Sequence, residues 1–331
     1  MSTPVKAGDQ ITGEFLVLKS AVRLTKAQKP YIDLDLRAVD GTVFEGCKRW
    51  GFAENAKGVI LIQGTVEEFN GSLQIKINTW EPGELQTKDF QARCPWPLEV
   101  AELVWQFGNM LDEILVDRIR DFTEDFITHW SCHRFPTMEA CPKRFFEHPG
   151  AQRIHHAYRH GLAEHTLEVM EHAHDIAECH EIQDYERSLL IAGCAMHDIG
   201  KLEEFHLVDG VYEFTPLGKA YGWNSNAHLH IGSQMFAVYT SMPDHGLTFE
   251  ECQILQNIIL GHHGEFGITE PKYIISMIAH LADLTSYNVN RMKMNLALTP
   301  GNEVSRDRVG KSYLPIIEPR PTHLDEDEEP K

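Results

Sequence analysis

The hydrophobic pattern changes its period partway along the chain, which limits the fold to at least two domains of different class. From Ile11 to about Trp80, apolar and polar residues alternate as they do in half-buried strands. The clearest run sets Ile32, Leu34, Leu36 and Ala38 against Asp33, Asp35 and Arg37. Beyond Gly150 the apolar residues recur at helical intervals instead. We therefore expect an all-β domain followed by an all-α domain.

The first 80 residues predict a small closed barrel. A hairpin is expected where Val59–Phe69 meets Leu73–Thr79, because Asn70-Gly71 suits the positive φ angles of a type I′ turn. About five short strands with no helical period between them are typical of an OB-type barrel. A small SH3-like barrel would give a similar pattern.

Prolines and a new apolar period mark the passage to the second domain. The segment 82–97 contains Pro82, Pro95 and Pro97, and the residues from Leu98 to about His129 then follow a helical period. One connecting helix is expected there. The predicted boundaries are 1–92 for the barrel, 93–150 for a helical connector, 151–305 for the helical domain and 306–331 for a tail. That tail is rich in proline and carries the acidic run Asp325 to Glu329, so it is expected to be disordered.

Four stretches carry the helical pattern of the second domain. The first has an apolar stripe of Leu162, His165, Val169, Ala173 and Ile176, and Leu189 to Met196 is expected to be a buried helix. Further helices are expected over Glu250–Leu260 and Tyr273–Val289.

Charge and cysteine content exclude several classes of protein. With 30 basic and 49 acidic residues the net charge is −19, which disfavours indiscriminate coating of a polyanion. The residues through Arg93 are balanced, so any contact with nucleic acid should be local and lie on the first domain. The seven cysteines never form a CxxC pair, and no stretch has the roughly 18 uninterrupted apolar residues of a membrane span. A reducing, cytoplasmic location with no membrane contact is expected.

Histidines concentrate in the second domain. The chain has 19, and the first 128 residues contain none. His197-Asp198 closes an apolar helix and precedes Ile199-Gly200-Lys201, where Gly200 is expected to take the left-handed conformation that ends a helix. Imidazole and carboxylate suit divalent ions, and a carboxylate can bridge two of them. Asp198 is the natural bridge.

Other potential ligands are spread over the helical domain, namely His165, His230, His262, His263 and Asp283. A single histidine on an apolar face is more often a core residue than a ligand. Spacing alone does not pair these residues.

Their order along the chain nevertheless resembles the H…HD…H…HH…D signature of the binuclear HD-superfamily phosphohydrolases. The resemblance implies that one ion is held by His165, His197, Asp198 and Asp283, and the other by Asp198, His230, His262 and His263. His228 competes with His230 for its role. The motif His230-Ile231-Gly232 fits the family sequence better and so favours His230. The side chains of His228 and His230 would point in opposite directions in an extended segment.

The short sequence motifs around these residues resemble those of the YhaM-type 3′-to-5′ exoribonucleases, in which an OB domain precedes an HD domain. They are His155-His156-Ala157-Tyr158, Gly161-Leu162, Glu164-His165-Thr166, His197-Asp198-Ile199-Gly200-Lys201 and His262-His263-Gly264. In the barrel the matching segments are Phe15-Leu16-Val17, Thr25-Lys26, Lys29-Pro30-Tyr31, Trp50 and Gly71-Ser72-Leu73-Gln74, so the likeness covers residues 10 to 290. The chain departs from the pattern at His160, in a shortened segment 265–273, and at Ser286, where a second aspartate often stands.

The resemblance implies a metal-dependent 3′-to-5′ exoribonuclease that acts on single-stranded RNA, with DNA as a further possible substrate. It implies two divalent ions, with manganese favoured over iron, cobalt or nickel. Asp198 and Lys201 would be catalytic, and His155, His156 and Arg159 would lie near the substrate. On the barrel, aromatic rings and cations suited to bases and phosphates are Arg23, Lys26, Lys29, Tyr31, Trp50 and Phe69.

Two other functions compete with this hypothesis. A phosphodiesterase for a small nucleotide or cyclic dinucleotide would use the same metal ligands, but Gly264-Glu265-Phe266-Gly267 lacks the GYP element of such enzymes. A nucleic-acid-binding regulatory protein with an inactive HD domain would not need a complete ligand set. A homo-oligomer is also conceivable, because one acidic barrel offers few phosphate contacts.

Overall fold

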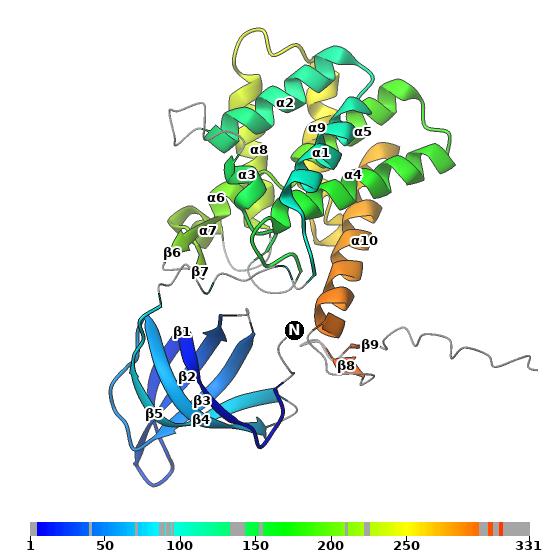
Figure 1. The fold of residues 1–331 in the computed structure, drawn as a ribbon. Helices are drawn as coiled ribbons and strands as arrows, with labels where there is room; N and C mark the ends of the chain where they lie inside the picture. Colours follow the sequence, from blue (N-terminus) through cyan, green and yellow to red (C-terminus); the bar gives the residue numbers. More distant parts are fainter. Residues whose placement is uncertain are drawn as a thin grey trace, which may run out of the picture.

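The computed structural model consists of a β-barrel and a helical domain (Figure 1). The structure describes residues 5–39, 42–69, 72–85, 90, 94, 96–132, 143–151, 155–208, 211–221, 226–297, 304–306 and 311–313. The expected Asn70-Gly71 turn and the acidic run of the tail lie outside the described residues.

Five strands close the barrel in the order β1-β2-β3-β5-β4. They are β1 (Gln10–Leu24), β2 (Pro30–Ala38), β3 (Val43–Trp50), β4 (Val59–Phe69) and β5 (Ser72–Pro82). Neighbours are antiparallel except β3 and β5, which meet in parallel, and β1 pairs with both β2 and β4. The expected OB-like barrel is confirmed.

The apolar residues of the alternating sequence pattern form the core of the barrel. Ile32, Leu34 and Leu36 are buried on β2, and Ile75 and Ile77 are buried on β5. Their polar neighbours face outward, as the period of two requires. The register between β4 and β5 shifts at Gly64, where a Cβ atom would lie 2.6 Å from the backbone oxygen of Lys76. Only glycine allows this close approach of the two strands.

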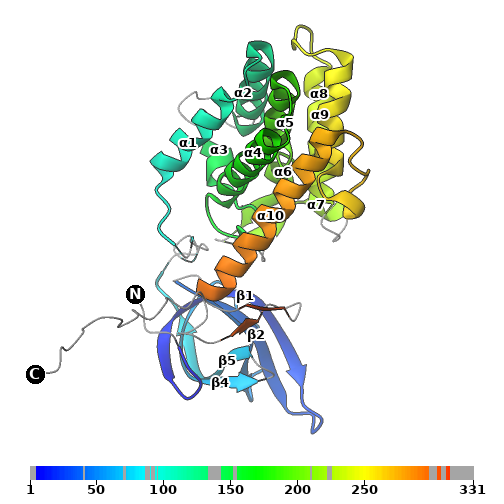
Figure 2. The same cartoon turned by 90° about the vertical axis from the view of Figure 1, so that its right-hand side faces the viewer.

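The helical domain is built from ten α-helices within the described residues (Figure 2). They are α1 (Val100–Asp112), α2 (Asp117–Cys132), α3 (Lys143–Glu147), α4 (Gly161–Cys179), α5 (Asp184–Met196), α6 (Lys201–Glu204), α7 (Pro216–Tyr221), α8 (Ala227–Thr240), α9 (Phe249–Gly261) and α10 (Ile274–Ala297). A short 3-10 helix, η3 (Gly264–Phe266), follows α9. Two small hairpins, β6 (Phe205–Val208) with β7 (Val211–Phe214) and β8 (Ser305–Arg306) with β9 (Ser312–Tyr313), complete the described elements.

The single helix expected over residues 98–129 is wrong. The structure has two helices, α1 and α2, separated by residues 113–116. Leu103 and Phe107 of α1 and Phe126 of α2 belong to the same hydrophobic core as α4 and α5. Burial of both helices on one core requires a change of direction that a continuous helix could not make. These residues thus pack as part of the helical domain.

The centre of the helical domain is α5, in which every residue from Ser188 to Met196 is buried. The helices α2, α4, α9 and α10 pack against it, and together their inward faces carry most of the remaining core. The polar residues that follow α5 therefore emerge in the interior rather than at the surface. Among the described helices, none combines the length and the apolar character needed to cross a membrane.

Candidate metal centre

His197 and Asp198 are held in the interior because they follow the buried helix α5 directly. His197 is 1% exposed and Asp198 is 2% exposed. Gly200 does not take the expected left-handed conformation, since its φ of −60° and ψ of −22° are helical. Its role is steric, because a Cβ atom there would clash with the backbone oxygen of His228 in α8. Gly200 thus allows the start of α8 to approach the His197-Asp198 pair.

The Asp198 carboxylate divides the surrounding imidazoles into two groups. Its Oδ2 lies 3.2 Å from Nε2 of His165 and 3.3 Å from Nε2 of His197. Its Oδ1 lies 3.3 Å from Nε2 of His228 and 3.7 Å from Nε2 of His262. Each carboxylate oxygen therefore faces its own pair of ring nitrogens.

Asp283 of α10 completes the first group. Its Oδ1 lies 3.1 Å from Nε2 of His165, which comes from the second turn of α4. The Nε2 atoms of His165 and His197 lie only 3.4 Å apart. Two ring lone pairs cannot face each other at this distance unless a proton or another cation lies between them.

His228, His262 and His263 form the second group. His262 and His263 directly follow α9, and their ring centroids are 4.5 Å apart. The ring of His228, in the first turn of α8, lies 5.0 Å from that of His263.

His230 is not part of either group, contrary to the sequence-based choice. Its ring stacks on Tyr221 at 5.0 Å with an interplanar angle of 14°. The segment is helical rather than extended, so the buried stripe of α8 runs through His228, Ile231 and Met235. The helical period of the apolar residues after Ala227 was the signal that could have selected His228.

Three of the histidines are oriented by a hydrogen bond from Nδ1, and a fourth, His228, by a close contact of Nδ1 with a carboxylate. Nδ1 of His197 lies 2.6 Å from the backbone oxygen of Cys194, and Nδ1 of His262 lies 3.0 Å from that of Ile259. Nδ1 of His228 lies 3.2 Å from Oε2 of Glu204, and Nδ1 of His263 lies 3.3 Å from Oδ1 of Asn226. A carbonyl or carboxylate oxygen can only accept, so Nδ1 carries the proton in each ring. The Nε2 atom then offers its lone pair, as in metal-binding histidines.

His165 is oriented by a relay of two residues that the sequence did not indicate. Its Nδ1 lies 2.8 Å from Oγ of Ser286, and that hydroxyl donates to Oε2 of Glu168 at 2.7 Å. Burial alone would raise the pKa of Glu168, but contacts with His156 and Ser286 outweigh it and lower that pKa to about 2. Because the single hydroxyl proton points at this carboxylate, Ser286 must accept from Nδ1 of His165. The serine that departs from the family pattern thus fixes the same tautomer as in the other four rings.

The charges of the cluster are set by burial and by mutual contact. Burial opposes ionisation of Asp198, yet Lys201 and His197 hold the pKa of Asp198 well below its usual range. Burial lowers the pKa of His165, but Asp198 and Asp283 outweigh it and raise that pKa to about 9. Burial lowers the pKa of His263 to about 4 and that of His262 well below its ordinary value. Contact with His165 likewise holds the pKa of Asp283 below its usual range, so both carboxylates are ionised, and His262 and His263 are neutral.

The donor set matches what divalent metal ions require. Three buried atoms at its centre, namely Oδ1 of Asp198, Nε2 of His228 and Nε2 of His262, have no hydrogen-bond partner. Unpaired buried polar atoms are costly, and these three point toward one another. Imidazole nitrogens together with carboxylate oxygens are ligands for manganese, iron, cobalt, nickel or zinc. The cluster is thus able to bind metal.

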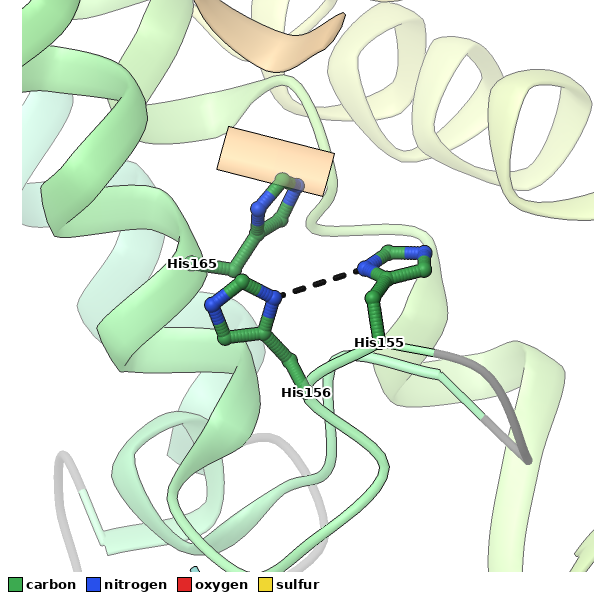
Figure 3. A group of neighbouring side chains, drawn as sticks. All are labelled: His155, His156 and His165. Atoms are coloured by element: carbon green, nitrogen blue, oxygen red, sulfur yellow. Dashed lines mark hydrogen bonds between the residues drawn. The ribbon is translucent and has the colours of Figure 1, made fainter. Parts of the chain in front are cut away.

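The other predicted residues of the helical domain differ in their surroundings. Nζ of Lys201 lies 2.5 Å from Oδ2 of Asp198 and is buried. Figure 3 shows His155, His156 and His165 with their rings gathered together, and Nδ1 of His155 lies 3.4 Å from Nδ1 of His156. His156 is fully buried, with Nε2 placed 3.2 Å from Glu168. Arg159 forms an ion pair with Glu147 at 2.6 Å, and its side chain is half exposed.

The predicted residues of the barrel lie largely on one surface. A pocket of about 430 Å³ is lined by Arg23, Tyr31, Asp33, Glu45, Gly46, Lys48, Phe69 and Gln74. The Tyr31 ring packs against Trp50 at 4.9 Å, while Nζ of Lys48 lies 5.0 Å from the centre of the Phe69 ring. Trp50 and Phe69 are more than half exposed. Sequence reasoning missed Lys48, which alternation along β3 places beside the aromatic residues.

Lys26 and Lys29 lie outside that pocket. Both are exposed in the turn between β1 and β2, where the backbone of Thr25 donates to Lys29 and Gln28 takes a positive φ of 59°. They adjoin the strand ends that carry Arg23 and Tyr31.

Replacing the two α8 histidines separately tests which one is a ligand. His228→Ala should weaken binding of one of two Mn²⁺ equivalents by at least 10-fold, because it removes an Nε2 donor from the second group. His230→Ala should leave both binding events unchanged. Titration calorimetry on the two variants measures this, and the opposite ranking would restore the sequence-based choice.

Replacing Ser286 tests the relay to His165. Ser286→Ala should weaken Mn²⁺ affinity by about 10- to 100-fold, because Nδ1 of His165 loses its acceptor while the ring itself stays. Thr285→Ala, an exposed neighbour on α10 whose hydroxyl donates only to the backbone of Leu281, is the matched control. Equal Mn²⁺ affinities for both variants would show that the relay does not orient the ligand.

Comparison with known proteins agrees with this geometry. Residues 162–288 match the HD domain family. The chain is 25% identical to the 3′-5′ exoribonuclease YhaM of Bacillus pumilus, over 90% of this chain and 92% of that protein. It is 24% identical to YhaM of Bacillus subtilis, over 91% and 92%, and 24% identical to YhaM of Listeria monocytogenes, over 92% and 95%. No solved structure gives a significant match. The chain therefore contains an HD domain, and the expected resemblance to the YhaM-type proteins is confirmed over about nine-tenths of its length.

Proposed function

We propose that this protein removes nucleotides from the 3′ end of single-stranded RNA by hydrolysis, with two divalent ions as cofactors. The observation that supports it most is the Asp198 carboxylate, whose two oxygens face two separate groups of imidazole nitrogens. This is the arrangement expected of a carboxylate that bridges two ions. The relatives named 3′-5′ exoribonuclease support the reaction and its polarity.

The ligands divide according to the two groups. The first ion is assigned to His165, His197, Asp198 and Asp283, and the second to Asp198, His228, His262 and His263. Manganese is favoured because the resemblance points to it and because the ligands combine imidazole with carboxylate. Bound ions supply a water of lowered pKa and positive charge for the scissile phosphate.

Residues beside the cluster can stabilise the negative charge of the substrate phosphate. Lys201 contacts Asp198 and adds a positive charge within the buried site, which stabilises the extra negative charge that develops on a phosphate during hydrolysis. His155 is partly exposed next to His165, and burial keeps its pKa well below the ordinary value. A neutral imidazole has one N–H to donate, so His155 can hydrogen-bond a phosphate oxygen. His156 acts through Glu168 and positions His165.

The barrel is proposed to hold the RNA strand. The exposed rings of Trp50 and Phe69 offer faces on which bases stack, and Arg23 and Lys48 lie beside them for the phosphates. Since the whole chain carries a net charge of −19, this local surface rather than the overall field must attract the strand.

Asp198→Asn should abolish turnover, with a loss of more than 10³-fold, because an amide cannot bridge two cations through two anionic oxygens. The assay follows a 5′-labelled single-stranded RNA with Mn²⁺ and looks for products shortened from the 3′ end. Asp175→Asn, an exposed aspartate on α4, is the control and should retain full activity. Wild-type protein that leaves RNA intact, or an active Asp198→Asn variant, would refute the proposal.

Trp50→Ala should weaken binding of a single-stranded oligonucleotide by about 5- to 150-fold, since one stacked base is worth about 1–3 kcal/mol. Fluorescence anisotropy in the Asp198→Asn background measures binding without cleavage. Val43→Ala removes an exposed apolar residue from the same strand, β3, and should bind like the parent. Unchanged affinity for Trp50→Ala would mean that the strand follows another surface.

A further inference from the structure

One face of α10 is apolar and open to solvent along most of its length. Six large side chains of α10, and Tyr273 directly before it, form this face, and we call them the α10 seam: Tyr273, Ile274, Met277, Leu281, Leu284, Val289 and Met292. Ile274 is 72% exposed and the others are each about 40–45% exposed. Figure 2 shows α10 running in front of the other helices of the domain.

The spacing of the seam differs from that of a scattered surface. Ile274, Met277, Leu281 and Leu284 follow intervals of three and four residues, which place them on one side of a helix. Asn288 takes the next position in this series. The opposite side of α10 carries Asp283 and Ser286, which serve the metal centre. The core and the site therefore do not explain the apolar residues of the seam.

The charged residues near this face limit the kind of partner that can pack against it. Between Tyr273 and Met292, all of them described, the charged residues are Asp283, which faces His165, and Arg291, which is buried. A chain with a net charge of −19 repels its own copies over most of its surface. A charge-free strip about 27 Å long, from the helical rise over residues 274–292, is where two such chains can meet.

The area of the seam is also that of a dimer contact. Its side chains expose roughly 90 Å² each, on the scale of about 200 Å² for a large residue that is fully exposed. Seven of them give about 600 Å², which approaches the ~800 Å² per partner of a standard interface. Isolated apolar residues need no explanation, but a continuous patch of this size marks an interaction surface.

From these features we infer that the protein forms a two-fold symmetric dimer in which the α10 seam of one copy packs against the α10 seam of a second copy. The helices cross near Leu281 and Leu284, which brings these residues of each copy together at the symmetry axis. Asn288 supplies a polar group that limits the register of the pair. The dimer brings two HD domains and two barrels into one particle, so a single strand can contact more than one cationic surface.

The test is the mass of the full chain in solution, by light scattering and sedimentation equilibrium between 5 and 100 µM. The wild type should have twice the chain mass of 37.8 kDa. The double variant Leu281→Lys, Leu284→Lys should have the mass of one chain, with dimerisation weakened at least 100-fold by like charges at the axis. Val104→Lys, which changes an equally exposed apolar residue on α1, should remain dimeric.

Circular dichroism and thermal melting verify that each variant is folded. Should the lysine variant unfold, the pair Leu281→Gln, Leu284→Gln serves in its place and should weaken the dimer at least 10-fold. A wild type that keeps the mass of one chain up to 100 µM would overturn the inference. A folded double variant that dimerises as tightly as the wild type would overturn it as well. Neither outcome depends on the metal centre or on nuclease activity.

Discussion

The buried charge of Asp198 is the constraint around which the helical domain is organised. An isolated carboxylate in the interior would cost many kcal/mol, so it is ionised there only because positive groups surround it. Those groups come from helices far apart in the sequence, with His165 on α4 and Lys201 on α6, while His228 on α8 and His262 after α9 face the other carboxylate oxygen. The burial of α5 brings the carboxylate into the interior, and the need to compensate its charge requires the other helices to converge on it.

The same constraint explains why so many polar residues outside the centre are buried. Each imidazole has a second nitrogen that must also be satisfied, and backbone oxygens or the side chains of Glu204, Asn226 and Ser286 accept its proton. These contacts fix the tautomer before any ion binds, so no binding free energy is lost in reorienting the rings. Glu168 joins two such rings, because it accepts from Ser286 and lies beside His156. Loss of one outer residue is therefore expected to act on the metal through a ring that itself stays in place.

Local patterns in the sequence predicted the barrel, and the resemblance to the HD signature predicted most of the residues that the structure brings together around Asp198. The alternation on β2 and β5 reflects only which face of each strand is buried, so it can be read from the sequence. The order of His165, His197-Asp198, His262-His263 and Asp283 can also be read directly along the chain. What failed depended on packing between distant segments. Gly200 was read as a helix end, whereas its role is to let α8 approach, and this is visible only once α8 is in place. His228 was passed over because His230-Ile231-Gly232 fitted the family pattern better and the segment was taken as extended. Ser286 was counted as a departure because an aspartate often stands there, and its link to Glu168, 118 positions away, is visible only in the fold.

The central claim is that two divalent ions lie on either side of the Asp198 carboxylate and bind Nε2 rather than Nδ1 of the surrounding histidines. Anomalous X-ray diffraction from crystals soaked in Mn²⁺ tests it most directly. The account predicts two peaks about 3.5–4 Å apart, one near Nε2 of His165 and His197 and the other near Nε2 of His228, His262 and His263. A single peak, coordination through Nδ1, or ions bound away from Asp198 would contradict it.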